Sequence, residues 1–497
     1  MEPVEAYEKL LGRVKELTVL GGIRSSLAWD SRTYMPKKAV AMRGDQQGWL
    51  AGVFHEKITD PEIGEWLSTI EGSIETFDEV QKRNVFLMRR TYDRITKIPK
   101  EHQIALTMQT NKAQRVWEDA KEQGDFSLFQ PELEKVVELV KKSAHYIDPD
   151  KPAYDVMLDT FERNLTEEEV SRIFGELKPH LIELVQKCQN SSVKPNQEVL
   201  HHKVPKHLQR KLSYDLADLV GYDMDRGSID EAEHPFTIGY YDDVRITTHF
   251  YENRFASSFF SVMHEAGHGI YEQNQSRDFL YQPVGGMASM GVHESQSRFL
   301  ENIVGRSEEF WQFYWNKFQE ITGYPDVDFS EFLLAINTVE NTKIRVEADE
   351  VTYGLHVIVR FEIERELMKG NIQVADLPKV WNEKINEYLG VDVQNDAEGV
   401  LQDIHWSSGQ FGYFPTYSLG NIYASQLHKK MMEDLDVPQL IKEGKIKDIL
   451  AWMDTHIHKK GALMDPVDLI RDVTGEDINI QHYVDYLNQK YGKLYGF

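Results

Sequence analysis

Apolar side chains recur at three- and four-residue spacing along most of this 497-residue sequence, and few turn-forming clusters interrupt them before about residue 150. This spacing places apolar side chains on one face of an α-helix, so it predicts helices that pack against one another. We expect breaks between helices at Gly21-Gly22, Met35-Pro36 and Ile98-Pro99. A capping box at Thr166-Glu167-Glu168-Glu169 predicts the start of a further helix. The fold class that follows is mainly α.

One segment departs from the helical period. Residues 234–249 are rich in β-branched and aromatic side chains on both sides of the acidic pair Asp242-Asp243. Such a pattern is typical of two strands joined by a tight turn. We therefore expect a β-hairpin, and with it a small β-sheet, shortly before His264.

The charge of the chain is strongly acidic, at −25, with 81 Asp and Glu against 56 Lys and Arg. This balance argues against nucleic acid or an anionic membrane as a partner, and a site for an anionic group must carry its own cation. Cys188 is the only cysteine, so we expect no intrachain disulfide and a packed thiol in an apolar helix. Because neither a secretion signal nor a membrane-spanning run is recognisable, we expect a cytoplasmic protein.

The chain is longer than the size at which one hydrophobic core usually stops growing, so we expect several lobes within one unit over residues 1–497. The polar, turn-rich stretch 190–196 is the best candidate for a linker. We expect a helical N-terminal lobe over residues 1–190, a catalytic core with the hairpin over 197–430, and C-terminal helices over 431–497.

A short motif lies within one of the helical stretches. It is the H-E-x-x-H sequence His264-Glu265-Ala266-Gly267-His268. Residues four apart lie on the same face of a helix, so the two imidazoles can occupy two positions of a tetrahedral Zn²⁺ site. On a helical wheel the two histidines lie opposite an apolar stripe formed by Phe255, Phe259, Val262, Ala266 and Ile270. This favours the wall of a cleft; the alternative is two surface histidines on an amphipathic helix.

A catalytic zinc site needs a third protein ligand and an open position for water. Carboxylates are plentiful downstream, and spacing alone selects none of them. Glu294 stands out because it begins a helical run after the glycine-rich loop Tyr281–Gly291. His293 is an alternative ligand from the same run, but it points elsewhere if Glu294 faces the metal.

These residues together favour a metal-dependent hydrolase, and above all a peptidase. Glu265 would take a proton from a metal-bound water and later hand it to the leaving amine, while the metal polarises the scissile carbonyl. The oxyanion that forms needs a further donor, for which a tyrosine or a protonated histidine is suitable.

Taken in order, the motifs of this chain resemble those of the carboxypeptidase Taq family, the thermostable carboxypeptidase 1 type of metallocarboxypeptidase. They are Trp29-Asp30 with Met35-Pro36, His234-Pro235-Phe236, Asp243–Thr247, the H-E-x-x-H, His293–Gln296, Ile344–Asp349 and Gly399–Trp406. The resemblance implies a largely helical, saddle-like molecule with a deep central groove, usually a homodimer. It implies removal of C-terminal residues from peptides, with broad side-chain tolerance and poor action after proline. The implied metal is Zn²⁺, or Co²⁺ in some members, held by His264, His268 and Glu294, and Glu265 is then the general base.

A carboxypeptidase must recognise the free α-carboxylate of its peptide substrate, and an arginine can do so with two parallel hydrogen bonds. Arg345, in the Ile344–Asp349 motif, is our first choice for this role. Arg245 is the second, although an ion pair with Asp243 or a neighbouring acid explains it equally well. The strand around Arg245–Thr248 could offer an edge on which an extended substrate pairs.

The stretch Phe411–Tyr417 is dense in aromatic residues, some of which serve core packing. A histidine followed by tyrosines in this order also resembles distantly related helical zinc peptidases, in which such residues hold the substrate carbonyl and the oxyanion. On this resemblance we assign His405 to substrate binding and Tyr417 to oxyanion stabilisation, with Tyr413 as its substitute. We expect Asp403 to orient a ring nitrogen of a nearby histidine.

Two rival functions are compatible with the same motifs. An oligopeptidase on a similar helical scaffold would cut internal bonds of short peptides. A non-catalytic protein would use a closed metal site for structure or binding, but such a site has no need of the unliganded carboxylate of Glu265.

Overall fold

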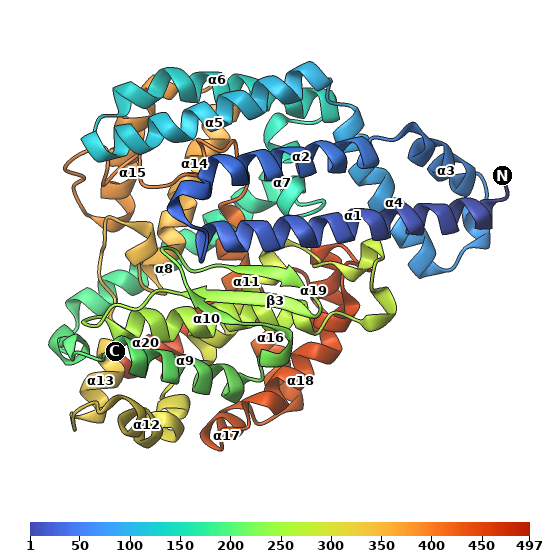
Figure 1. Cartoon of the computed structure of the whole chain (residues 1–497). Helices are drawn as coiled ribbons and strands as arrows, with labels where there is room; N and C mark the ends of the chain where they lie inside the picture. Colours follow the sequence, from blue (N-terminus) through green and yellow to red (C-terminus); the bar gives the residue numbers. More distant parts are fainter.

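The computed structural model describes residues 1–497 and consists mainly of α-helices with one small β-sheet, which confirms the predicted fold class (Figure 1). The helices before the sheet are α1 (Pro3–Arg32), α2 (Val40–Ile58), α3 (Pro61–Glu71), α4 (Glu79–Thr96), α5 (Lys100–Gln123), α6 (Phe126–Ile147), α7 (Ala153–Phe161), α8 (Glu167–Asn190) and α9 (Lys206–Val220). The helices after it are α10 (Phe255–Gln273), α11 (Met290–Arg298), α12 (Glu308–Thr322), α13 (Phe329–Ala335), α14 (Thr352–Lys369), α15 (Leu377–Leu389), α16 (Pro415–Asp434), α17 (Val437–Lys442), α18 (Ile446–His456), α19 (Pro466–Thr474) and α20 (Gln481–Tyr495). None of them combines the length and the apolarity needed to span a bilayer.

Two of the three predicted helix breaks are confirmed. α1 ends before Pro36 and α4 ends before Pro99, since a proline lacks the backbone donor that a helix interior needs. The break predicted at Gly21-Gly22 is wrong, because both glycines lie inside α1. Each glycine lowers the stability of a helix by only about 1 kcal/mol relative to alanine. The helix can therefore continue through the pair when the residues on both sides favour it. α8 begins with the predicted capping box, in which the side chains of Thr166 and Glu169 each accept a hydrogen bond from the other's backbone N–H.

The buried apolar side chains form two large cores. The first contains 13 residues from α1 to α4 and the turns between them. The second contains 99 residues and extends from Ala113 in α5 to Tyr495 in α20, so α5 to α8 pack into the main core. Cys188 is buried in this second core, and burial raises the pKa of its thiol to about 12, as expected of a packed thiol.

The β-sheet lies against α10 in the middle of the molecule (Figure 1). β2 (Thr237–Tyr240) and β3 (Asp243–Thr248) form the predicted antiparallel hairpin. β1 (Ile229–Glu231), which was not predicted, pairs in parallel with β3, so the strand order is β1-β3-β2. The expectation that residues 245–248 offer a free edge is therefore wrong, because β3 is the central strand.

α10, α11 and α16 approach one another closely, and glycines make this possible. A Cβ added to Gly267, within the H-E-x-x-H, would lie 2.5 Å from the carbonyl oxygen of Gln296 on α11. A Cβ added to Gly420 on α16 would lie 2.5 Å from Cγ of Glu294. The predicted apolar stripe of α10 is buried in the main core and consists of Phe255, Phe259, Val262, Ala266 and Ile270. This packing brings the opposite face of α10 against α11.

Candidate metal centre

Two imidazoles and one carboxylate meet where α10 packs against α11. The Nε2 atoms of His264 and His268 lie 3.8 and 3.3 Å from Oε2 of Glu294, and the possible ligand atoms of the three residues lie within 4.8 Å of one another. Donor atoms about 2.1 Å from a tetrahedral metal ion are about 3.4 Å apart, so this spacing suits one shared ion. The structure thus brings together the three residues that were expected to bind a metal.

The second nitrogen of each imidazole is held by a partner outside this group. His264 Nδ1 lies 2.9 Å from Oε2 of Glu301, and His268 Nδ1 contacts Nδ1 of His293. His293 in turn contacts Oε1 of Glu272 through its Nε2, at 2.9 Å. These contacts orient both rings and leave both Nε2 atoms free for a metal. His293, the alternative ligand, therefore supports His268 from behind.

A single arginine connects the carboxylate ligand to the residue that supports His264. α11 continues into a π-helical turn, Phe299–Val304, which carries Glu301, and turns of this kind are frequent at functional sites. Arg298 donates to Oε1 of Glu294 at 2.7 Å and to Oε2 of Glu301 at 3.2 Å. The guanidinium thus directs the other oxygen of Glu294, Oε2, toward the histidines.

Two of the three ligands, Glu294 and His268, are held in the protonation states that a metal requires. Burial raises the pKa of Glu294, but Arg298 and His264 lower it by more, so the carboxyl group is ionised far below its usual range. Burial and the neighbouring His293 lower the pKa of His268 to about 3, which leaves the ring neutral above that pH. Metals bind carboxylates and neutral imidazoles, so little proton release opposes binding at these two ligands.

Glu265 lies beside the three ligands without being one of them. Its Oε2 accepts a hydrogen bond from Oγ1 of Thr237 on β2, at 2.6 Å. Burial raises the pKa of the Glu265 carboxyl group, and a more basic carboxylate is a better proton acceptor. The sheet thus fixes the carboxylate that the sequence assigns as general base.

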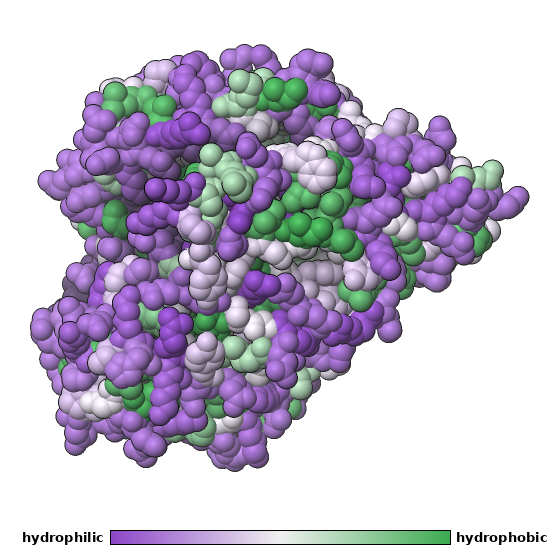
Figure 2. Space-filling model, viewed as in Figure 1, coloured by the Kyte–Doolittle hydropathy of each residue, from purple (hydrophilic) through white to green (hydrophobic).

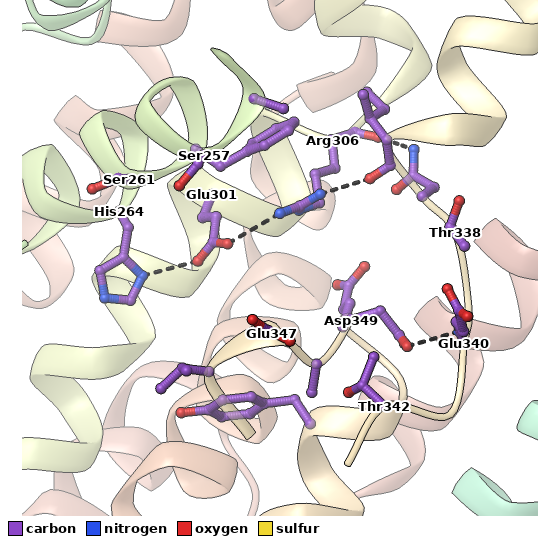
Figure 3. A pocket seen from close by; sticks show the side chains of 18 of the residues that line it. Ser257, Ser261, His264, Glu301, Arg306, Thr338, Glu340, Thr342, Glu347 and Asp349 are labelled. Atoms are coloured by element: carbon purple, nitrogen blue, oxygen red, sulfur yellow. Dashed lines mark hydrogen bonds and ion pairs between the residues drawn. The ribbon is translucent and has the colours of Figure 1, made fainter. Parts of the chain in front are cut away.

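A cavity of about 540 Å³ opens from this group of residues (Figure 3). α10 lines one side with His264 and Glu265, and the π-helical turn adds Glu301. The facing side is the segment 335–350, between α13 and α14. Figure 2 shows the molecular surface hollowed between the upper and lower parts of the view. A cavity of this size can hold a small ligand or the end of a peptide.

Arg345 lines this cavity from the short helical turn Arg345–Glu347. Its Nε and Nη2 donate to Oδ1 of Asp403 at 3.0 and 2.7 Å, and its Nη1 donates to the hydroxyl of Tyr353 at 2.9 Å. Oδ2 of Asp403 accepts from Arg360 Nε at 2.7 Å. The expected role of Asp403 in orienting a histidine is therefore wrong, because this carboxylate holds two arginines instead. A guanidinium has five donor hydrogens, so Arg345 retains donors for a carboxylate.

Arg245, the second candidate for binding a carboxylate, does not line the metal cavity. Its Nε and Nη2 pair with the two carboxylate oxygens of Asp243 at 2.6 and 2.9 Å, and its guanidinium lies over the ring of Trp29. It borders separate hollows beside α1. The ion pair with Asp243 accounts for this arginine, and the geometry does not support a role in substrate binding.

The rings of His405, Tyr413 and Tyr417 form one cluster. The hydroxyl of Tyr417 lies 3.4 Å from Nε2 of His405, and the rings of the two tyrosines are 5.3 Å apart. Burial raises the pKa of both tyrosines, and the charge of Glu294 adds to the increase, so both hydroxyls stay protonated and can donate. Burial lowers the pKa of His405 to about 4, so its ring is neutral near pH 7.

Four supporting residues were not predicted from the sequence: Thr237, Glu272, Arg298 and Glu301. A signal existed for two of them, because Glu294, Arg298 and Glu301 follow at spacings of four and three residues and so share a helical face. No sequence spacing indicates Thr237, since its contact with Glu265 depends on how the hairpin packs against α10.

The donor set fits a catalytic metal. Two imidazole nitrogens and a carboxylate oxygen border a cavity, and a carboxylate that is not a ligand lies beside them, as in peptidase zinc sites. The fold and this site define a metal-dependent peptidase.

Comparison with known proteins identifies the family. The chain belongs to the carboxypeptidase Taq (M32) metallopeptidase family, whose model matches residues 9–491. It is 38% identical to carboxypeptidase 1 of Bacillus subtilis over 497 residues, covering 99% of each chain. It is also 38% identical to thermostable carboxypeptidase 1 of Thermus thermophilus over 510 residues, covering 100% of each. The crystal structure of the M32 carboxypeptidase from Deinococcus radiodurans R1 matches with a TM-score of 0.96 at 33% identity, covering 99% of this chain and 100% of that one. The protein is therefore a metallocarboxypeptidase, and the resemblance seen in its motifs is confirmed.

Proposed function

We propose that this metallocarboxypeptidase removes amino acids one at a time from the C-termini of peptides, with broad side-chain tolerance, by Glu265-assisted attack of water. The observation that carries this mechanism is the position of Glu265. It borders the cavity, next to three metal ligands, and its hydrogen bond from Thr237 occupies only Oε2. Oε1 is left to accept a proton from water.

The reaction then divides between the metal and the side chains around it. When bound, the metal polarises the scissile carbonyl and lowers the pKa of water. Glu265 accepts the proton of the attacking water and delivers it to the nitrogen of the leaving amino acid. Its raised pKa suits both steps, because the group must give up the proton that it has taken.

Arg345 is our choice for binding the α-carboxylate of the substrate. It lines the cavity, and the single carboxylate of Asp403 is shared between Arg345 and Arg360. This group of three residues therefore carries one positive charge in excess. A free C-terminal carboxylate compensates that charge, whereas an internal peptide bond does not. This difference favours exopeptidase action.

Tyr417 is our choice for stabilising the oxyanion, with Tyr413 as the substitute and His405 in substrate binding. Both tyrosines are protonated donors near the carboxylate ligand Glu294, as the transition state requires. The contact between Tyr417 and His405 fixes the hydroxyl and the neutral ring relative to each other.

We propose that one Zn²⁺ per subunit occupies the site, with Co²⁺ as an alternative. Imidazole and carboxylate ligands in this combination suit zinc. Elemental analysis of protein purified without added metal tests the assignment, and the expected result is about one zinc per chain. A metal-free preparation that neither zinc nor cobalt activates would contradict the assignment.

We also propose a homodimer that associates through α1 and α2. Val40, Met42 and Trp49 on α2 are 63%, 67% and 70% exposed, and Val19 on α1 is 47% exposed. Figure 2 shows apolar residues over these helices. An exposed apolar face of this kind is typical of an association surface. Light scattering should give twice the chain mass for the wild type and a monomer for Trp49→Glu; a monomeric wild type would rule out the proposal.

The rival oligopeptidase is distinguished by one pair of substrates. A peptide with a free C-terminus should lose its last residue, and the same peptide with a C-terminal amide should be stable, because only the first offers a carboxylate to Arg345. Internal cleavage of the amidated peptide would favour the oligopeptidase. Bound metal without hydrolysis of either peptide would favour the closed, non-catalytic site.

A further inference from the structure

The cations that line the metal cavity differ in how far their charge is already compensated. Arg298 is bound by the carboxylates of Glu294 and Glu301. Arg306 donates to Glu301 at 3.3 Å and to the carbonyl oxygen of Ile336 at 2.6 Å. No lysine lines the cavity. Arg345, with its excess of positive charge, is therefore the only guanidinium suited to an anionic group, and the proposed function uses it for the α-carboxylate.

The carboxylates on the facing side of the cavity are in the opposite situation. Glu340 and Glu347 both line the cavity, are exposed, and form no ion pair. Figure 3 shows them on the segment opposite α10, with Glu347 nearer to His264 and Glu340 at the far end. Asp349, between them, accepts from the backbone N–H groups of Val351, Thr352 and Glu340 and is thus engaged in the start of α14.

We propose that Glu347 and Glu340 select substrates with a cationic side chain, lysine or arginine, near the scissile bond. The inference rests on the proposed carboxypeptidase function and adds a preference to its broad tolerance of neutral side chains. Glu347 would contact a cation close to the scissile bond, and Glu340 a cation farther from it. An acidic side chain would meet two uncompensated carboxylates and no free cation besides the arginine that binds the C-terminus.

The test uses neutral free-acid peptides in which one position carries lysine, glutamine or glutamate. The variable position is moved from the last residue to each of the three before it, and kcat/KM for the first cut is measured at low salt. An ion pair of this exposure corresponds to a preference of about 5-fold for lysine over glutamine at the positions that face the two carboxylates. The preference should weaken in 0.5 M NaCl, which screens exposed charges to within about 4 Å.

Variants assign the preference to individual residues. Glu347→Gln should abolish it at the position closest to the scissile bond, and Glu340→Gln at a more distant one. Glu309→Gln, which removes a carboxylate of α12 outside the cavity, is the matched control and should leave every ratio unchanged. Glu309→Gln should also cleave the glutamine peptide at the wild-type rate, and the lysine preference is taken as a ratio of two peptides within each variant, so that a general change in rate does not enter it.

Two results would overturn the proposal. One is that lysine, glutamine and glutamate peptides are cleaved within 2-fold of one another at every position. The other is a lysine preference that survives in the Glu340→Gln, Glu347→Gln double variant. Neither result affects the carboxypeptidase function, whose failure would show separately as stability of the glutamine peptides.

Discussion

The two walls of the metal cavity differ in how far neighbouring side chains compensate their charges. On the wall formed by α10 and the π-helical turn, the charged side chains are held by neighbouring side chains, as His264 is by Glu301 at 2.9 Å. On the facing wall, residues 335–350, Glu340 and Glu347 are exposed and have no ionic partner. The first wall is fixed by its own contacts, whereas the second leaves charges for a ligand to compensate.

This difference separates the reaction from the choice of substrate. A wall whose groups orient one another holds the metal ligands in one geometry, which catalysis requires. A wall with free carboxylates can discriminate among side chains without altering that geometry. Substitutions on the first wall should therefore change the rate for every peptide, and substitutions of the free carboxylates on the second wall should change the ratio between peptides.

The largest effect is expected on the first wall for Glu265→Gln. Loss of the general base should lower kcat by roughly 10² to 10⁴-fold, with the metal content unchanged, because Glu265 is not a ligand. Single-peptide kinetics and elemental analysis measure both quantities. Glu309→Gln on α12, outside the cavity, is the control and should leave kcat for a neutral peptide unchanged. A Glu265→Gln enzyme with wild-type kcat would remove the proposed base.

Glu301→Gln tests whether the contacts behind the ligands matter. The amide keeps the size of the side chain but replaces the charge that holds His264 and Arg298, so metal affinity should fall about 10- to 100-fold. Competition with a chromophoric chelator measures this affinity directly, without reference to activity. Equal metal affinities in the variant and the wild type would show that the carboxylate of Glu301 does not contribute to metal binding.

Arg345→Ala tests the link between the second wall and the α-carboxylate. Loss of a charge-assisted hydrogen bond should raise KM for free-acid peptides about 10-fold or more, with a smaller change in kcat. Arg345→Lys keeps the charge without the planar fork and should lie between the variant and the wild type. If KM for Arg345→Ala stays near the wild-type value, another group binds the substrate's C-terminus.

The smallest expected effect is on how the free energy of unfolding depends on pH, through a histidine that lies behind the first wall. The ring of His428 on α16 packs against the ring of Phe299, with 6.0 Å between the ring centroids. Burial lowers the pKa of His428 to about 4. Between about pH 6.5 and 4 the unfolded chain binds a proton here that the folded chain does not, so acidification over this range favours unfolding. His428→Gln should reduce this loss by up to about 1.4 kcal/mol per pH unit, measured by urea unfolding at several pH values. Glu347→Gln should leave it unchanged; an identical pH dependence for His428→Gln would contradict the lowered pKa.

The sequence predicts the first wall well because helical periodicity is a local property. His264 and His268 are four residues apart, and any helix places them together, so the pair needs no knowledge of the rest of the fold. The prediction of Glu294 as the third ligand required only that a loop and a second helix follow the first. Their supporting groups, such as Thr237, come from elements whose contacts arise only when the hairpin packs on α10. No regular spacing of residues in the sequence indicates such contacts.

The second wall and the edges of the fold were harder to predict for the same reason. Arg245 and Arg345 look alike in the sequence, and only packing places one over Trp29 and the other in the cavity. Likewise, β3 becomes the central strand because β1, a three-residue strand with no pattern of its own, pairs beside it. Pairing between distant segments decided both outcomes.

The most direct measurement is mass spectrometry of a mixed peptide pool after digestion with the metal-stripped protein, with and without added Zn²⁺ or Co²⁺. The structure predicts a ladder of products shortened only from the C-terminus, which appears when metal is restored and is absent for Glu265→Gln. Internal cleavage products, or a ladder of equal intensity without metal, would contradict a metallocarboxypeptidase that works through His264, His268, Glu294 and Glu265.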